Sequence, residues 1–162
     1  MIFLKQTANS FYKKGSMLVE VLVVLAIVVM ILGIVLPSFK TMKESSVVKS
    51  GAQDILSALD KARSKTLASV NSSEYGVHFE ANKIVVFRGV SYFQNDANNE
   101  IIDIVPPSAI SNVTLGGVSG VSGDIYFSRL SGAPSKTGTI TIGISSLFKN
   151  VTISATGLAS VN

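Results

Sequence analysis

The sequence predicts an α+β protein in which one long N-terminal helix packs, through its second half, on a mostly antiparallel β-sheet. Three observations predict this fold class. Residues 17–36 form an almost unbroken apolar run, residues 38–70 show apolar side chains at helical spacing, and the chain from residue 71 onward changes to short β-branched runs separated by Gly, Asn and Ser. We therefore expect an apolar helix over 16–37 and a head made of helix 38–70 and sheet 71–162.

Residues 17–36 predict a membrane-spanning helix. Eighteen of these twenty residues are apolar, and the two exceptions are Glu20 and Gly33. At about 1.5 Å per residue such a helix is about 30 Å long, which matches the hydrocarbon core of a bilayer. Basic residues precede the run, which favours an N-terminus in the cytoplasm and a head outside it. No small-x-small cleavage site follows the run, so it does not have the pattern of a secretory signal peptide.

Glu20 is the one charged residue inside the apolar run. A carboxylate within a membrane raises the free energy of insertion by about 2.5–3.5 kcal/mol, so we expect Glu20 to have a partner. An alternative is that Glu20 lies at the membrane boundary and reaches water. Gly33 and Pro37 predict a kink or local unwinding, because proline removes an amide donor and clashes with the preceding turn. An alternative is that Pro37 ends the span at the membrane surface.

Two spacings of apolar residues, one helical and one alternating, predict the structure of the head. In 38–70, spacings of three and four place one apolar face on a helix that runs to Val70, through Ala52, Ile55, Leu56, Leu59, Ala62 and Thr66. Partly alternating runs then predict strands at 75–80, 83–87, 101–105, 124–127, 139–144, 150–154 and 158–161. Ala81-Asn82 predicts a tight hairpin, Gly157 predicts a turn, and the glycine-rich segment 116–123 is interpreted as a flexible connection.

Composition and charge argue against most enzyme and nucleic-acid-binding classes. The chain has 162 residues, no Cys and a single His, which excludes a disulfide framework and a zinc site built on paired His or Cys ligands. Of 14 basic residues, Lys5, Lys13 and Lys14 lie in residues 1–15, which leaves 11 basic against 10 acidic residues in the rest. The net charge of +4 therefore belongs mainly to the N-terminal tail, and we do not expect nucleic acid as a partner.

The head offers few residues that could carry chemistry. His78 alternates with Val77 and Phe79, so we expect it on the face opposite the core, in contact with solvent. Asp96, Asn98, Glu100 and Asp103 carry oxygen atoms that could form a calcium loop, but the EF-hand order is absent and a polar hairpin tip explains the same residues. No Ser or Cys stands in a nucleophile motif. We therefore predict no catalytic residue, no metal and no cofactor.

The prefix of the apolar run resembles a known signal. The stretch Lys13-Lys14-Gly15-Ser16-Met17-Leu18-Val19-Glu20 resembles the leader of type IV prepilins and type II secretion pseudopilins. The resemblance implies that a prepilin peptidase removes residues 1–15 by cleavage after Gly15 and methylates Ser16. It also implies that Glu20 pairs with the N-terminal amine of a neighbouring subunit. The family usually has Phe and often Thr after the cleaved glycine, where this chain has Ser16 and Met17.

The second half is similar to a narrower group, the H-type minor pseudopilins of type II secretion and the FimT-like minor pilins. The likeness lies in the runs 75–87, 125–127, 138–142 and 151–157. The resemblance implies a pilin-like fold and a structural subunit of a pseudopilus or type IV pilus, held by a single span in the inner membrane and assembled through its N-terminal helix. Its partners would be the prepilin peptidase, other pilins or pseudopilins, and the inner-membrane assembly platform. Two alternatives are a filament-displayed minor pilin that binds DNA or surfaces, and a membrane-anchored β domain that does not polymerise.

Overall fold

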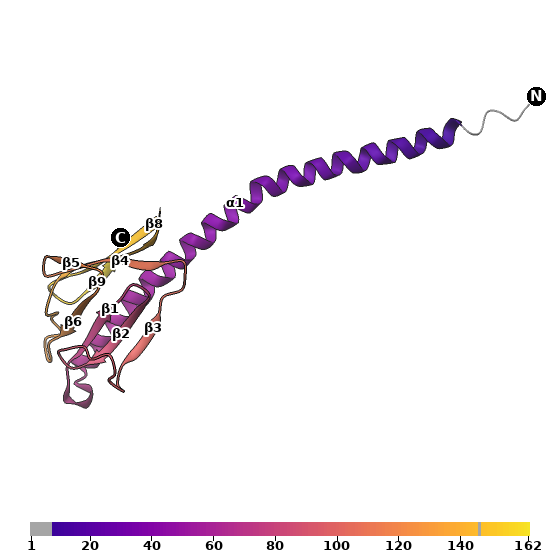
Figure 1. The fold of residues 1–162 in the computed structure, drawn as a ribbon. Coiled ribbons are helices and arrows are strands. Elements are labelled where there is room, and N and C mark those ends of the chain that lie inside the picture. The colour runs from indigo at the N-terminus through magenta and orange to yellow at the C-terminus, as the bar shows by residue number, and fades with distance from the viewer. Residues whose placement is uncertain (1–7, 146) are drawn as a thin grey trace, which may run out of the picture. The chain divides into compact units, whose positions relative to one another are not determined.

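The computed structural model describes residues 8–145 and 147–162, but not the side chains of residues 8–16 and 36–38. The described chain forms a long helix, α1 (Ala8–Leu67), a short 3-10 helix, η1 (Val70–Ser72), and nine strands (Figure 1). The predicted α+β class is confirmed. The chain divides into two units, Met1–Met42 and Lys43–Asn162, so the C-terminal part of α1 belongs to the unit that contains the strands.

The strands of the described chain form two antiparallel sheets, where the sequence predicted one. Sheet A has the order β3-β2-β1-β6 and sheet B the order β5-β4-β7-β8-β9. Strand bounds in chain order are β1 Tyr75–Phe79, β2 Lys83–Arg88, β3 Glu100–Asp103, β4 Ala109–Leu115, β5 Val118–Gly120, β6 Gly123–Phe127, β7 Gly138–Ile144, β8 Leu147–Ile153 and β9 Ala159–Val161. The chain crosses from sheet A to sheet B after β3, returns for β6, and ends in sheet B.

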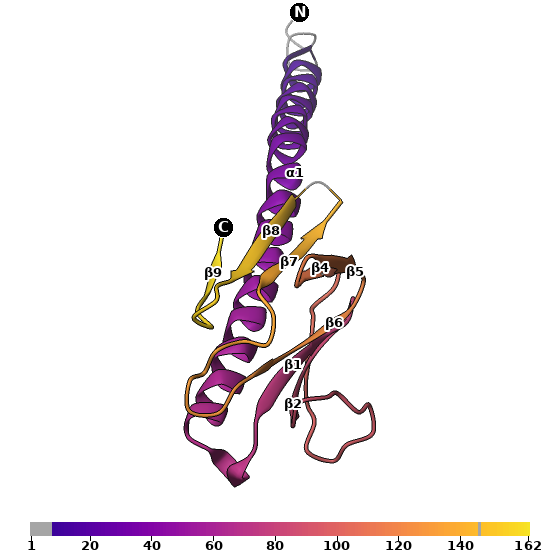
Figure 2. The ribbon, with the colours of Figure 1, turned by 90° about the vertical axis from the view of Figure 1, so that its left-hand side faces the viewer.

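The C-terminal part of α1 supplies the centre of the core, and β7, β8 and β9 lie side by side next to it (Figure 2). Most of the predicted helical face is buried, namely Ala52, Ile55, Leu59, Ala62 and Thr66. They pack with the inward side chains of both sheets, among them Val77, Phe127 and Ile140. A Cβ at Gly51 would lie 2.5 Å from the Ile142 Cδ1 atom, so glycine leaves room at this point of the helix for the end of the Ile142 side chain of β7.

Helix α1 ends at Leu67, three residues before the predicted end at Val70. Ser69 and Asn71 have φ angles of 49° and 50°, in the left-handed region where an α-helix cannot continue. The buried Thr66 hydroxyl donates to the Ala62 carbonyl oxygen at 2.9 Å and accepts the Tyr75 backbone N–H at 2.9 Å. This single side chain therefore joins the end of the helix to the start of β1.

We expect Thr66→Val to lower the free energy of unfolding by about 1–3 kcal/mol, because valine fills the space of threonine but leaves the Tyr75 N–H buried without an acceptor. Thr66→Ser keeps the hydroxyl and is the matched control, with a smaller loss. Urea unfolding of the full chain in detergent, followed by circular dichroism, measures both variants. Equal losses for valine and serine would contradict the bridging role of the hydroxyl.

Strands β4 and β5 were not predicted, and the interpretation of 116–123 as a flexible connection was wrong. Gly116 and Gly117 have φ angles of 61° and 81° and make the tight turn of a hairpin in which Leu115 pairs with Val118. Two glycines with positive φ are typical of the two-residue turns that join antiparallel strands. The glycine-rich composition therefore reflects a defined turn.

The outer face of sheet A, which points away from α1, has its own buried side chains. Val85 and Phe87 alternate along β2 with the core residues Ile84 and Val86, so they lie on the opposite face. Each is only 1% exposed. Part of the cover comes from the loop between β2 and β3, residues 89–99, because its Tyr92 ring contacts the Phe87 ring at 5.8 Å between centroids. We call this segment the 89–99 loop.

Candidate functional site

The N-terminal unit presents an apolar helix surface on every side. Residues 17–35 are all exposed, including Leu18, Met30 and Ile34, and an 18-residue window reaches a mean hydropathy of 3.2 with no part buried. The described residues contain one helix that is long and apolar enough to cross a membrane, and residues 17–35 belong to it. A helix that is apolar all round is stable only where lipid or other helices cover it. This surface is the first candidate functional site.

Glu20 is the charged side chain of this surface. It is exposed, and the structure records no hydrogen bond or ion pair for it within the described part of the chain. The side chains of Ser16 and Pro37 lie outside the described residues, as do the surroundings of Gly15. Cleavage after Gly15 and methylation of Ser16 therefore stay predictions. The backbone of residues 33–37 is helical within α1, so the local unwinding predicted at Gly33 and Pro37 is not seen, and a kink there stays a prediction.

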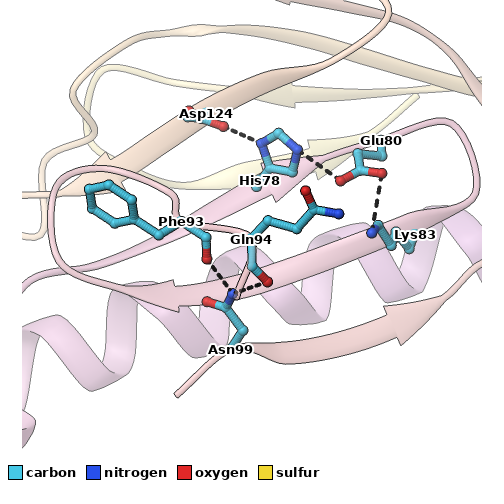
Figure 3. Close-up of polar contacts among 7 residues, drawn as sticks. All are labelled: His78, Glu80, Lys83, Phe93, Gln94, Asn99 and Asp124. Carbon is cyan, nitrogen blue, oxygen red and sulfur yellow. Dashed lines mark hydrogen bonds and ion pairs between the residues drawn. The ribbon is translucent and has the colours of Figure 1, made fainter. Parts of the chain in front are cut away.

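The second candidate site is a cluster of charges around His78 on the outer face of sheet A (Figure 3). Strand register places His78 on β1 directly opposite Asp124 on β6, and the His78 Nδ1 atom contacts the Asp124 Oδ1 atom. On the other side of the ring, the His78 Nε2 atom lies 3.2 Å from Glu80 Oε1. The second Glu80 oxygen lies 3.3 Å from the Lys83 ammonium nitrogen. Two carboxylates thus bracket the imidazole.

His78 lies on the predicted face, opposite the core, but its ring is mostly covered where the sequence predicted a solvated side chain. The Tyr92 ring stacks on the imidazole with centroids 3.9 Å apart and planes 10° from parallel, and the His78 side chain is 13% exposed. The alternation of side chains along β1 predicted the face of the sheet on which His78 lies. It could not predict Tyr92, which comes from the 89–99 loop, fourteen residues further along the chain. Only the tertiary fold brings these two rings together.

The cluster around His78 does not have the geometry of a hydrolytic site. Each ring nitrogen of His78 faces a carboxylate oxygen, so neither is directed at a hydroxyl or thiol that it could activate. The two carboxylates also lie at opposite ends of the ring (Figure 3) and cannot bind the same ion with it. Within residues that the structure describes, no group of three His, Asp or Glu side chains could hold a metal.

Three of the residues considered as a calcium loop, Asp96, Asn98 and Glu100, are engaged with the protein itself. Asp96 accepts hydrogen bonds from the Asn98 backbone N–H at 2.8 Å and from its side-chain amide at 2.7 Å, and these bonds lower the pKa of Asp96. Glu100 accepts from the Lys61 ammonium, and its other oxygen lies 3.4 Å from the Lys65 nitrogen. The hydrogen bond from Lys61 is the main cause of the lowered pKa of Glu100, and Lys65 adds to it. In the described part of the chain these residues do not form a group of three acidic side chains that could hold a metal ion.

We expect Glu100→Gln to lower the free energy of unfolding at pH 7 by at most about 1 kcal/mol, because the ion pair is largely exposed. Since the pKa of Glu100 is lowered in the folded state, its stabilising effect is present above the ordinary pKa of a glutamate, about 4.3. The effect is lost as pH falls through the lower folded-state pKa. Chemical denaturation from pH 7 to about pH 3 should show the two chains converging. A constant difference over that range would contradict this origin.

Several cations of the head donate to protein acceptors. Arg63 donates to the carbonyl oxygens of Gly132 and Thr156, and Arg88 donates to the Ser73 hydroxyl and the Asn71 carbonyl oxygen. A phosphate-binding surface needs several basic side chains directed outward from one face. These contacts connect the end of α1 and η1 to the surrounding loops, so they have a structural role.

Comparison with known proteins gives no neighbour from which a role could be transferred. No protein-family model, no curated protein and no solved structure matches this chain. The fold and the two sites define an α+β protein with an exposed apolar N-terminal helix, and its function has to be argued from those features.

Proposed function

We propose that this chain is a minor pilin or pseudopilin, a structural subunit of a type II secretion pseudopilus or type IV pilus. The observation that carries the proposal is the helix surface of residues 17–35, which is apolar on all sides and contains one carboxylate, Glu20. A surface of this kind requires a bilayer before assembly and neighbouring apolar helices after it. A filament built around bundled N-terminal helices provides the second environment.

The position of Glu20 supports polymerisation over simple anchoring. A single anchoring helix gains nothing from a carboxylate three residues inside its apolar run, because burial without a partner is unfavourable. Cleavage after Gly15 would create a positively charged amine at Ser16, four residues from Glu20. Between staggered neighbouring subunits, that amine and the Glu20 carboxylate neutralise one another where water is excluded.

The proposed route requires three kinds of partner. The prepilin peptidase removes residues 1–15 on the cytoplasmic side, the inner-membrane assembly platform extracts the helix from the bilayer, and other pilins or pseudopilins cover it in the filament. Lys13 and Lys14 precede Gly15 and favour a cytoplasmic N-terminus. The unit Lys43–Asn162 has its own buried core, as a head displayed outside the membrane would need.

Fractionation tests the proposal. We expect the epitope-tagged chain to extract with the inner membrane when it is expressed alone. With a type II secretion or type IV pilus machine present, a fraction should move to sheared filaments. A chain that stays in the membrane in the presence of every such machine tested would favour the non-polymerising alternative. Retardation of DNA at moderate salt would instead favour a DNA-binding minor pilin.

A further inference from the structure

The 89–99 loop and His78 belong to the head and lie outside the apolar helix surface of residues 17–35. The loop is braced internally: the Asn99 side-chain amide donates to the Phe93 carbonyl oxygen at 2.7 Å and lies 3.4 Å from the Gln94 carbonyl oxygen (Figure 3). The Asn99 and Asp96 backbone N–H groups close two further turns inside it. These bonds hold residues 93–99 together as one ordered turn structure.

Tyr92 joins the 89–99 loop to the outer face of sheet A. Its ring stacks on the His78 imidazole and also contacts Phe87, so it covers part of the apolar outer face that contains Val85 and Phe87. Phe93, the next residue, is 68% exposed, so the second aromatic ring of the loop points away from this anchor. Tyr92 is therefore the residue of the 89–99 loop that contacts both His78 and the apolar outer face.

The geometry around His78 fits the positively charged imidazolium. Carboxylate oxygens only accept hydrogen bonds, so the contacts of His78 with Asp124 and Glu80 are both hydrogen bonds only when both ring nitrogens carry protons. Lys83 contacts the second oxygen of Glu80, and the four side chains then carry two positive and two negative charges. Loss of the His78 proton leaves one nitrogen lone pair facing a carboxylate and leaves the cluster with a net negative charge. A charged ring also attracts the face of Tyr92 more strongly than a neutral one.

We propose that the 89–99 loop is a pH-dependent cover over the outer face of sheet A, held closed by the charged form of His78 and released when that proton is lost. The groups that face the imidazole are Asp124 from β6, Glu80 after the end of β1, and Tyr92 from the loop, with Lys83 of β2 acting through Glu80. Release uncovers Phe87, which Tyr92 contacts in the closed form, and so exposes apolar surface of the head that is otherwise hidden.

Hydrogen exchange of the full chain in detergent micelles tests this proposal. Exchange in 89–99 is compared with exchange in β7 at about pH 5.5 and pH 8.5, on either side of the range in which histidine ordinarily changes charge, after correction for the intrinsic rate. We expect relative exchange in the loop to rise about threefold to tenfold at the higher pH, because opening the loop breaks the stacking of Tyr92 on the ring, and that contact weakens when the ring loses its charge. No rise would overturn the proposal.

Variants identify the group responsible. His78→Gln should remove the pH response, and Asp124→Asn, which keeps an acceptor without its charge, should reduce it. Asp60→Asn, an exposed carboxylate of α1, is the matched control and should respond like the natural chain. A response that persists in His78→Gln would assign the effect to another group and overturn the proposal.

Because the chain has a single histidine, NMR can measure the protonation of its ring directly. With ¹⁵N-labelled histidine, the two ring nitrogens of His78 give separate NMR signals that report which of them is protonated. We expect both to carry protons whenever the 89–99 loop is protected from exchange. A protected loop over a ring with one protonated nitrogen would contradict the proposal, even if a variant failed to fold.

Discussion

Replacing Glu20 with alanine is expected to leave membrane insertion intact and to lower incorporation into filaments more than tenfold. Removal of the carboxylate relieves the unfavourable burial of a charge in the bilayer, by about 2.5–3.5 kcal/mol. In the filament, however, the amine of a neighbouring subunit loses its partner in a site without water, and breaking a buried pair in this way costs about 3–5 kcal/mol. Carbonate extraction measures insertion, and immunoblots of sheared filaments measure incorporation.

Glu20→Asp is the matched control for this prediction, because it keeps the charge and shortens the side chain by one methylene. We expect it to retain part of the incorporation. If the alanine variant entered filaments as well as the natural chain, Glu20 would have no role in assembly, and its place at the membrane boundary would be the better explanation.

Replacing Gly15 with phenylalanine is expected to abolish removal of residues 1–15, and with it entry into filaments. Glycine adds no side chain at the bond to be cleaved, whereas a ring adds bulk where the peptidase must approach the backbone. Gly15→Ala should still be processed in part. Electrophoretic mobility of chains expressed with the peptidase measures the processed fraction, and equal processing of all three chains would contradict this site.

The sequence predicted the helical part of the head better than the sheets. In α1, Ala52, Ile55, Leu59 and Ala62 follow a regular period of three and four, and all are buried as expected. In β4, the buried residues are Ile110, Val113 and Leu115, and a register shift between Ile110 and Asn112 interrupts the alternation by which a strand is recognised. All three residues of β5 are exposed, so this edge strand has no apolar pattern to detect.

Of the two candidate sites, the sequence predicted the one made of neighbouring residues and missed the one assembled by the tertiary fold. The apolar surface of 17–35 and the isolated charge of Glu20 depend on sequence neighbours alone, so they could be read without a structure. The cluster at His78 needs Asp124, which lies 46 residues away and arrives through the pairing of β1 with β6. Glu80, two residues from His78 and so on the same face of the strand, was the one partner that the sequence could have indicated.

The N-terminal residue of the chain isolated from membranes and from filaments tests the central claim most directly. In cells with an active prepilin peptidase, we expect intact mass and terminal sequencing to show a chain that begins at Ser16 and carries a methylated amine, in both fractions. Without the peptidase, the chain should keep residues 1–15 and stay out of filaments. A chain that begins after Phe39, or one that keeps its first fifteen residues beside an active peptidase, would contradict assembly through the N-terminal helix.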